Sequence, residues 1–246
     1  MLRPRFHVSD ALSRGETLEL SPAVSNHITR VLRLREGKQI CLFDGTGVEA
    51  TATIVEATRK STLVNIEQVG VKSRESTLQI VLAIAMSRGD RMDTIVQKAT
   101  ELGVQSIVPL VTDRTELRLS SERVEKKVAH WRNVAISACE QCGRNTVPEF
   151  LHPQPLKQAL ARFSDYKQAT KLILHPEEAS SSPLDSDCRE LILLIGPEGG
   201  FSEHEVADAK ASGFRTLTLG PRVLRTETAP LVAIAIAQAR WGDLLG

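Results

Sequence analysis

The sequence predicts two domains: a small β-barrel over residues 1–72 and an α/β domain with a mostly parallel sheet over residues 73–246. Three observations predict this division. Apolar and polar residues alternate with a period of two on both sides of Asp44 and Gly45. The segment 71–77 is polar and aperiodic, as a linker would be. From residue 77 onward, continuous apolar strands alternate with helical patterns.

The elements of the first domain follow from local patterns. Residues 38–58, KQICLFDGTGVEATATIVEAT, read as a hairpin because a DG pair separates two alternating runs. Residues 62–69, TLVNIEQV, supply a further strand of period two. Ahead of them a short helix is expected, beginning near Ser21 or Ser25. A barrel is the usual way to close strands this short around one core.

The second domain begins with TLQIVLAIAM, whose continuous apolar character is typical of a central parallel strand. Asp90 is expected to cap the next helix, which stops at Gly103. A long helix opens at Ser121. Its inward face is predicted to carry Val124, Val128, Trp131 and Ala135. Further strands are expected at 105–111, 147–151, 171–174, 191–195 and 215–219, further helices at 155–163, 203–212 and 229–245, and a surface loop at 177–187.

Composition places the chain among ordinary globular proteins, with 41% hydrophobic and 25% charged residues in 246. The beginning of the sequence lacks the apolar run of a signal peptide, and the longest apolar stretches are too short to span a bilayer. We therefore expect a soluble, cytoplasmic protein without a membrane partner. A net charge of +1 argues against a global basic field.

Two cysteines form a C-x-x-C pair, Cys139 and Cys142, in ACEQCGR. A zinc site would require a second pair or histidines at ligand spacing, and neither is present in the sequence. The pair closes a long helical pattern, where a thioredoxin-like motif would open one. Reduced thiols and no bound metal are the expectation.

Basic residues are densest in ITRVLRLREGK, which carries Arg30, Arg33, Arg35 and Lys38. Charge alone leaves two interpretations open: a solvated face, or a surface that holds phosphates.

The stretch LIGPEGGFSEHE runs from a buried strand directly into a glycine-rich turn and then a helix. Without Cβ atoms, Gly196, Gly199 and Gly200 allow positive φ angles and let a ligand approach the main chain. Ser202 and Glu205 have the spacing of a capping box at the start of the helix. The spacing matches neither a P-loop nor a G-x-G-x-x-G fingerprint. Alone, the loop is equally consistent with a simple tight turn.

A second loop of the same kind, TLGPRVLRTETAP at 218–230, again follows a strand, carries Gly-Pro and leads into a helix. Apolar Val223 and Leu224 lie between the turn and the helix. Two such adjacent loops would form a cleft with main-chain polar groups and aliphatic walls, suited to a purine nucleoside ligand. The stretch LHPEE after the strand at 171–174 could supply a third wall.

These two loops, together with EQCGR at 140–144, KATELGV at 98–104, HITRVLRLREG and LFDGTG, closely resemble the RsmE family. Its members are bacterial 16S ribosomal RNA uridine N3-methyltransferases of the SPOUT class. The resemblance covers essentially the whole chain. It implies a PUA-like β-barrel followed by a SPOUT α/β domain with a C-terminal trefoil knot, a rare exception to unknotted chain paths. It also implies a homodimer and, as substrate, 16S rRNA within the small subunit at the uridine known as U1498.

In this family the knotted loops bind S-adenosylmethionine, so the resemblance assigns cofactor binding to the matching loop residues. They are Leu174, His175, Ile195, Gly196, Pro197, Glu198, Gly199, Gly200, Leu219, Gly220, Val223, Leu224, Arg225 and Thr226.

Uracil N3 carries a proton at neutral pH, so its methylation requires a base or a cation that stabilises the uracil anion. Candidate cations are Arg225, Arg144 and Arg114, and candidate bases are Glu198 and Glu140. Our hypothesis is that Arg225 stabilises charge on a uracil carbonyl while a glutamate accepts the proton. The alternative is that Glu198 and Glu227 cap helix N-termini, where the helix dipole favours carboxylates.

The Watson–Crick edge of the uridine must be unpaired for this reaction. Arg30, Arg33 and Arg35 are expected to hold the surrounding RNA phosphates. Arg114, in TDRTELR, is a further RNA-binding candidate, although a loop ion pair is an equal alternative.

Two other function classes were compared with methyl transfer. An RNA-binding assembly factor that has lost catalysis is disfavoured by the intact glycine loops and Arg225. A nicotinamide or nucleoside-phosphate enzyme is disfavoured because no glycine fingerprint opens the α/β domain.

Overall fold

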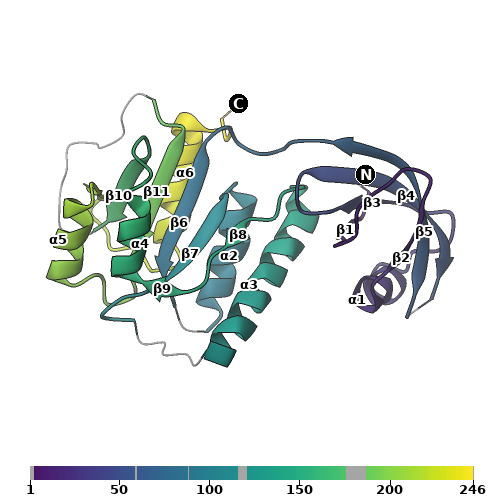
Figure 1. Ribbon diagram of the computed structural model, residues 1–246, viewed down its shortest axis with the longest axis horizontal. Helices are drawn as coiled ribbons and strands as arrows, with labels where there is room; N and C mark the ends of the chain where they lie inside the picture. The colour runs from purple at the N-terminus through teal and green to yellow at the C-terminus, as the bar shows by residue number, and fades with distance from the viewer. Residues whose placement is uncertain (1–2, 59, 88, 116–120, 176–186, 246) are drawn as a thin grey trace. The chain divides into compact units, whose positions relative to one another are not determined.

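The computed structural model describes residues 3–58, 60–87, 89–115, 121–175 and 187–245, and it divides into two compact units (Figure 1). The first unit contains Met1–Glu75 and Ile136–Val147, and the second contains Ser76–Ala135 and Pro148–Gly246. Helix α3 (Ser121–Cys142) passes from the second unit into the first. Most of the expected surface loop at 177–187 and part of TDRTELR lie outside the described residues.

The first unit contains a five-stranded sheet in the order β1-β3-β4-β5-β2. The expected hairpin is confirmed, since β3 and β4 pair antiparallel and β5 continues the meander. The two outer strands were not predicted because each has only three or four residues. Within the described part of the chain, β1 and β2 are edges, so strand pairing does not close a ring. The strands are β1 (Arg5–His7), β2 (Thr17–Leu20), β3 (Gln39–Phe43), β4 (Val48–Ala57) and β5 (Thr62–Val71).

The expected short helix is present as α1 (Pro22–Asn26) continued by the π-helical turn η1 (His27–Val31). It begins at the first of the two predicted positions, where Ser21 Oγ accepts a hydrogen bond from the Val24 N–H at 3.4 Å. Ile28 of this helix is fully buried in the core of the sheet. The helix therefore covers the sheet of its own unit.

The end of η1 has an unusual backbone. The Leu34 N–H donates to the carbonyl of Ile28 at 3.0 Å, which closes a turn of seven residues with a left-handed residue just before Leu34. Arg33 occupies that position with φ 53°. Glycine is the usual residue there because a Cβ atom is strained in this conformation.

The second unit contains a seven-stranded sheet in which β6 lies between β11 and β7, and β12 lies at the edge beyond β10. All of the pairings are parallel, as expected for continuous apolar strands. Every strand predicted in this domain is present, and only the two-residue β9 was missed. The strands are β6 (Gln79–Ala85), β7 (Ser106–Val111), β8 (Glu149–Phe150), β9 (Gln154–Pro155), β10 (Thr170–Leu174), β11 (Glu190–Ile195) and β12 (Arg215–Leu217).

Helices cover both faces of this sheet. One face packs against α4 (Leu156–Phe163) and α5 (Glu203–Ala211), with Phe163 and Val206 in the shared core. On the opposite face α6 (Ala229–Trp241) contacts β11 and α2 (Arg91–Glu101). Figure 1 shows α4 in front of the strands and α6, in yellow, behind them.

The prediction that Asp90 caps α2 is confirmed for its position and wrong for its side chain. Asp90 holds the N-cap position of α2, but its side chain makes no cap hydrogen bond because its backbone is already helical (φ −78°, ψ −3°). Asp93, in the first turn, accepts a hydrogen bond from the His130 ring at 2.7 Å. Helix α2 ends before Gly103, as predicted, and Gly103 has φ 83°.

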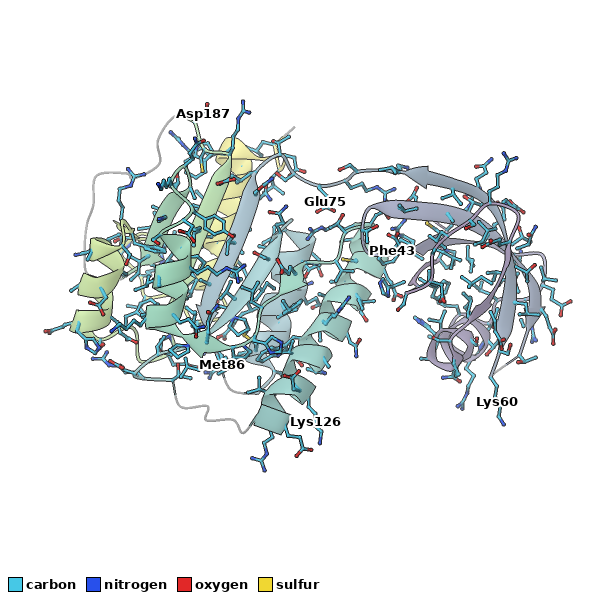
Figure 2. All side chains as sticks on the ribbon, viewed as in Figure 1. Phe43, Lys60, Glu75, Met86, Lys126 and Asp187 are labelled. Atoms are coloured by element: carbon cyan, nitrogen blue, oxygen red, sulfur yellow. The ribbon has the colours of Figure 1, made fainter. Side chains whose placement is uncertain are left out.

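The parallel strands of the second unit end at one edge. Figure 2 labels Met86, just after β6, and Asp187, just before β11, at opposite ends of the sheet. The connections that follow β6, β10, β11 and β12 therefore gather at the Met86 edge. In open α/β sheets this carboxyl edge is where ligands bind.

Among the described residues, no helix is long and apolar enough to cross a membrane.

Candidate active site

A cavity of about 470 Å³ lies at the carboxyl edge of the parallel sheet, between the connections that follow β10, β11 and β12. All of the predicted cofactor-binding residues except Arg225 line it. The two glycine loops are therefore brought together with Leu174 and His175 of the expected third wall, LHPEE, whose other three residues lie outside the described residues. A smaller hollow of about 340 Å³ adjoins it, sharing Arg114, Glu198 and Gly199.

The loop after β11 depends on its glycines for this shape. A Cβ on Gly196 would lie 3.1–3.2 Å from the ring carbons of Phe201 and 3.2 Å from its backbone nitrogen. Gly200 has φ 70°, and its N–H donates to the carbonyl of Pro197 at 2.8 Å. A side chain at either position would strain or displace the loop, so glycine keeps the main chain exposed to the cavity.

Hydrogen bonds at the start of α5 hold the C-terminal end of this loop. The predicted capping box is present, with the Ser202 N–H donating to Glu205 Oε2 at 2.9 Å. The other oxygen of the buried Glu205 carboxylate accepts the Asp113 N–H at 2.9 Å. Glu205 thus joins the helix start to the connection after β7, which fixes the backbone next to Arg114.

Arg114 was predicted to bind RNA. Its Nη1 donates to the carbonyl oxygen of Gly199 at 2.6 Å, and its side chain lines both hollows. The structure therefore gives this guanidinium a partner in the glycine loop.

The loop after β12 is held mainly by its own helix. The N–H groups of Thr228 and Ala229 both donate to the carbonyl of Arg225 at 2.9 Å. Leu224 and Thr226 line the cavity, whereas Arg225 between them does not, and its side chain is 85% exposed. The alternation directs the Arg225 guanidinium to the outer side of the cavity wall.

Four charged side chains connect the two glycine loops. Arg91 Nη1 lies 2.6 Å from Glu198 Oε1, and Arg91 Nε lies 3.9 Å from Glu227 Oε2. The other oxygen of Glu227 is 3.9 Å from Arg225 Nη1. The N-caps of the two helices are Ser202 and Thr228, so neither glutamate is a cap.

Glu140 and Arg144 are not part of the cavity lining, and both have partners within the first unit. Glu140 Oε1 accepts the His7 N–H at 3.1 Å. Burial raises the pKa of the Glu140 carboxyl, and the hydrogen bond from His7 opposes this shift. Arg144 is buried and forms an ion pair with Glu75, with its Nε 3.0 Å from Glu75 Oε2. Both side chains therefore have structural partners within the first unit.

The three arginines predicted to hold RNA, Arg30, Arg33 and Arg35, are all exposed in the first unit. Val31 between them is 65% exposed and Leu32 is 40% exposed. The surface therefore combines cations with apolar side chains.

The cysteines are free thiols, as predicted. Burial raises the pKa of Cys139 to about 12, so this thiol is protonated and unreactive at neutral pH. No group of three or more metal-ligating side chains occurs in the part of the chain that the structure describes.

Sequence reasoning missed Arg91. It also missed six residues of the cavity lining: Phe201, Glu203, Leu217, Thr218, Arg222 and Ala229. A signal for Arg91 was available, because it follows the carboxyl end of β6, beside the glycine loop in the sheet order. Its pairing with glutamates more than one hundred residues away had no signal in a single sequence.

Comparison with protein families agrees with the two-part organisation. Residues 74–238 match the model of an RNA methyltransferase domain, and residues 20–67 match that of an RNA methyltransferase PUA domain. The chain is similar to ribosomal RNA small subunit methyltransferase E of Buchnera aphidicola, with 34% identity over 98% of both chains. It is 30% identical to the Bacillus subtilis protein of that name, over 91% of this chain and 90% of the relative.

Two solved structures are similar over nearly their whole length. The ribosomal RNA small subunit methyltransferase E of Neisseria gonorrhoeae, bound to S-adenosylmethionine, has 40% identity and a TM-score of 0.92 over 98% of this chain and 99% of that one. A protein of Legionella pneumophila in complex with its cofactor SAM has 42% identity and a TM-score of 0.93 over 99% and 100% of the two chains.

Proposed function

Because the chain belongs to the RNA methyltransferase family of ribosomal RNA small subunit methyltransferase E, we propose that it methylates N3 of U1498 in 16S rRNA, using S-adenosylmethionine. The observation that carries this proposal is the cavity at the carboxyl edge. Three connections that are distant in sequence converge there, and all but one of the cofactor residues implied by the family resemblance line it.

The residues present fit the cofactor. A volume of about 470 Å³ lies within the range of small-molecule sites. Glycines at 196, 199 and 200 leave main-chain polar groups accessible, while Leu219 and Leu224 offer aliphatic contact to a purine ring. When bound, S-adenosylmethionine supplies an activated methyl group on a sulfonium sulfur.

Methyl transfer is a direct displacement in which the carbon–sulfur bond breaks as the N3–carbon bond forms, and the N3 proton must leave. The protein contributes mainly by holding the uracil in line with the methyl group. It must also stabilise the negative charge that develops on the ring as the proton departs.

Arg225 is suited to the second task. Its neighbours Leu224 and Thr226 line the cavity, and its own exposed guanidinium lies on the outer side, where RNA can reach it. We assign Arg225 to the substrate and not to the cofactor: its guanidinium donates to a uracil carbonyl as the ring becomes anionic.

Glu198 is the candidate acceptor of the N3 proton, because it is the catalytic carboxylate candidate that lines the cavity. Glu140 and Arg144 are better explained by their bonds to His7 and Glu75.

The RNA is proposed to lie across residues 1–72, with transfer performed by residues 73–246. This boundary is supported by the end of β5 at Val71 and the start of β6 at Gln79. The exposed Arg30, Arg33 and Arg35 are the proposed phosphate contacts. The substrate is proposed to be rRNA within the small ribosomal subunit, so the protein would act in the cytoplasm.

We further propose that the second unit has the SPOUT trefoil knot. The path of the chain after β12 supports it: β12 lies at the sheet edge beyond β10, yet α6 contacts β11 and α2. The segment between must pass back across the carboxyl edge. A homodimer is proposed as well, supported by exposed apolar side chains toward the end of the chain, at Ile236, Leu244 and Leu245.

The proposed function is tested by incubating the protein with S-adenosylmethionine and small subunits that lack the modification, then mapping the rRNA by mass spectrometry. One new methyl group at N3 of U1498 is expected. Methylation of another nucleotide would refute the substrate, and binding of NADH or ATP in place of S-adenosylmethionine would refute the reaction.

A further inference from the structure

Arg91 connects the two glycine loops although it belongs to neither. It is the first residue of α2, a helix fixed in the core by the buried Met92 and Ile95. Its Nη1 contacts Glu198 in the loop after β11 at 2.6 Å, and its Nε lies 3.9 Å from Glu227 in the loop after β12.

We propose that Arg91 is a positioning residue that holds the two loops together and, through Glu227, sets the place of Arg225. The catalytic part of this inference rests on the proposed function. The part that concerns the loops does not.

The charges explain why a cation is needed at this point. Glu198 and Glu227 lie on different loops, and both carboxylates approach the same guanidinium. Without Arg91 these two like charges would have no shared cation between them, which disfavours close approach of the loops. One arginine removes this repulsion and adds a charge-assisted hydrogen bond to Glu198.

The shape of the guanidinium matters as well as its charge. Nη1 and Nε lie along different directions of one planar group, so a single arginine contacts two carboxylates in a fixed relation. A lysine ammonium preserves the charge but not this planar arrangement.

Glu227, which contacts Arg91, also contacts Arg225. The Arg225 guanidinium lies 3.9 Å from Glu227, whose side chain is only 24% exposed and is thus better fixed than Arg225 itself. The position of Glu227 therefore restricts where the exposed Arg225 side chain can go. The Arg91–Glu198 pair is half-exposed and Arg225 is largely exposed, so we expect little effect on global stability and a clear effect on loop order.

Hydrogen exchange on the full chain without ligand tests the loop part directly. Arg91→Ala should raise amide exchange in segments 196–200 and 219–228 by about tenfold, with β6 and β7 unchanged. Lys98→Ala is the matched control, because it removes a half-exposed cation of α2 whose ion pair, within the described ranges, is with Glu101 of the same helix. Unchanged exchange in both loops of Arg91→Ala, or an equal rise in Lys98→Ala, would overturn the proposal.

A double variant distinguishes repulsion between Glu198 and Glu227 from the loss of Arg91 packing as the cause of faster exchange. Adding Glu227→Gln to Arg91→Ala should return exchange in the loop after β11 toward the wild-type rate, because one of the opposed charges is gone. Arg91→Lys should have an intermediate exchange rate. Exchange that is as fast in the double variant as in Arg91→Ala would refute the electrostatic explanation.

Titration calorimetry and single-turnover methylation then test the catalytic part. Arg91→Ala should weaken S-adenosylmethionine binding about tenfold, and its methylation rate at saturating cofactor should remain low. A normal rate at saturation would mean that Arg91 does not position Arg225. If the wild-type protein failed to bind or use the cofactor, the proposed function would fall, while the exchange results would still decide the loop proposal.

Discussion

The guanidinium of Arg114 donates a hydrogen bond of 2.6 Å to the carbonyl oxygen of Gly199, so a residue from the connection after β7 braces the glycine loop after β11. Arg114→Ala should therefore weaken S-adenosylmethionine binding about tenfold even without RNA, since the loop loses a charge-assisted bond. Calorimetry with cofactor alone measures this. An unchanged cofactor affinity, combined with weaker RNA binding, would contradict this function and support the predicted contact of Arg114 with RNA.

Arg225→Ala should lower the methylation rate about 100-fold, in line with the loss of one donor to a developing anion. Because Arg225 does not line the cavity, the affinity for S-adenosylmethionine should stay within about twofold. Single-turnover kinetics and calorimetry give the two values. A large loss of cofactor affinity would show that Arg225 serves the cofactor.

Arg33→Gly should make the protein more stable, because Arg33 has φ 53° and glycine adopts that conformation without strain. We expect a gain of about 0.5–1 kcal/mol. The same change should weaken RNA binding and reduce its salt dependence. Thermal unfolding and RNA titrations at several salt concentrations measure both effects.

Arg35→Gly is the control, because it removes the same charge from an exposed residue without a positive φ. It should weaken RNA binding without any gain in stability. Stabilisation by Arg35→Gly, or RNA binding and salt dependence unaffected by Arg33→Gly, would contradict this explanation.

Gly196→Ala should impair cofactor binding more than stability. The added Cβ would approach the Phe201 ring at 3.1–3.2 Å, so the loop must shift at the cavity wall. An affinity loss of about tenfold is expected by calorimetry. Gly213→Ala is the comparison, since it strains a residue with φ 88° outside the cavity lining. It should reduce stability by about 1 kcal/mol and leave binding intact.

Glu140→Gln should stabilise the protein at neutral pH and not at acidic pH. Burial raises the pKa of Glu140 in the folded state, so the folded protein binds this proton more tightly than the unfolded chain does. The stability contributed by the protonated form is therefore present below the unfolded pKa and is lost as pH rises through the folded pKa. Glutamine retains an oxygen for the His7 N–H without the charge.

Thermal unfolding of both proteins between pH 4 and pH 8 measures this, with the difference expected to grow as pH rises. Methylation by Glu140→Gln should persist if its function is the hydrogen bond to His7. Loss of methylation with unchanged stability would make Glu140 a catalytic base after all.

Sequence patterns predicted most of the elements, although not the short strands β1, β2 and β9, and they indicated the glycine loops as the candidate site. The alternating runs around Asp44, the apolar run of β6 and the box of Ser202 and Glu205 depend on residues close together in the chain, so a single sequence contains them. The glycine loops were recognisable for the same reason. Their convergence followed from a general property, the shared carboxyl edge of parallel strands.

Only the tertiary structure decided what the charged side chains do. Arg91 and Glu198 are 107 positions apart, and Arg114 and Gly199 are 85 apart. The sequence left Arg114 open between RNA binding, catalysis and a loop ion pair, made Glu140 one of two candidate bases, and gave no function to Arg91. The ionic partners of a long side chain depend on which charged groups lie near it in the folded protein. One sequence pattern is compatible with many such pairings. Local order is therefore readable in the sequence, whereas the choice of ionic partner is a property of the fold.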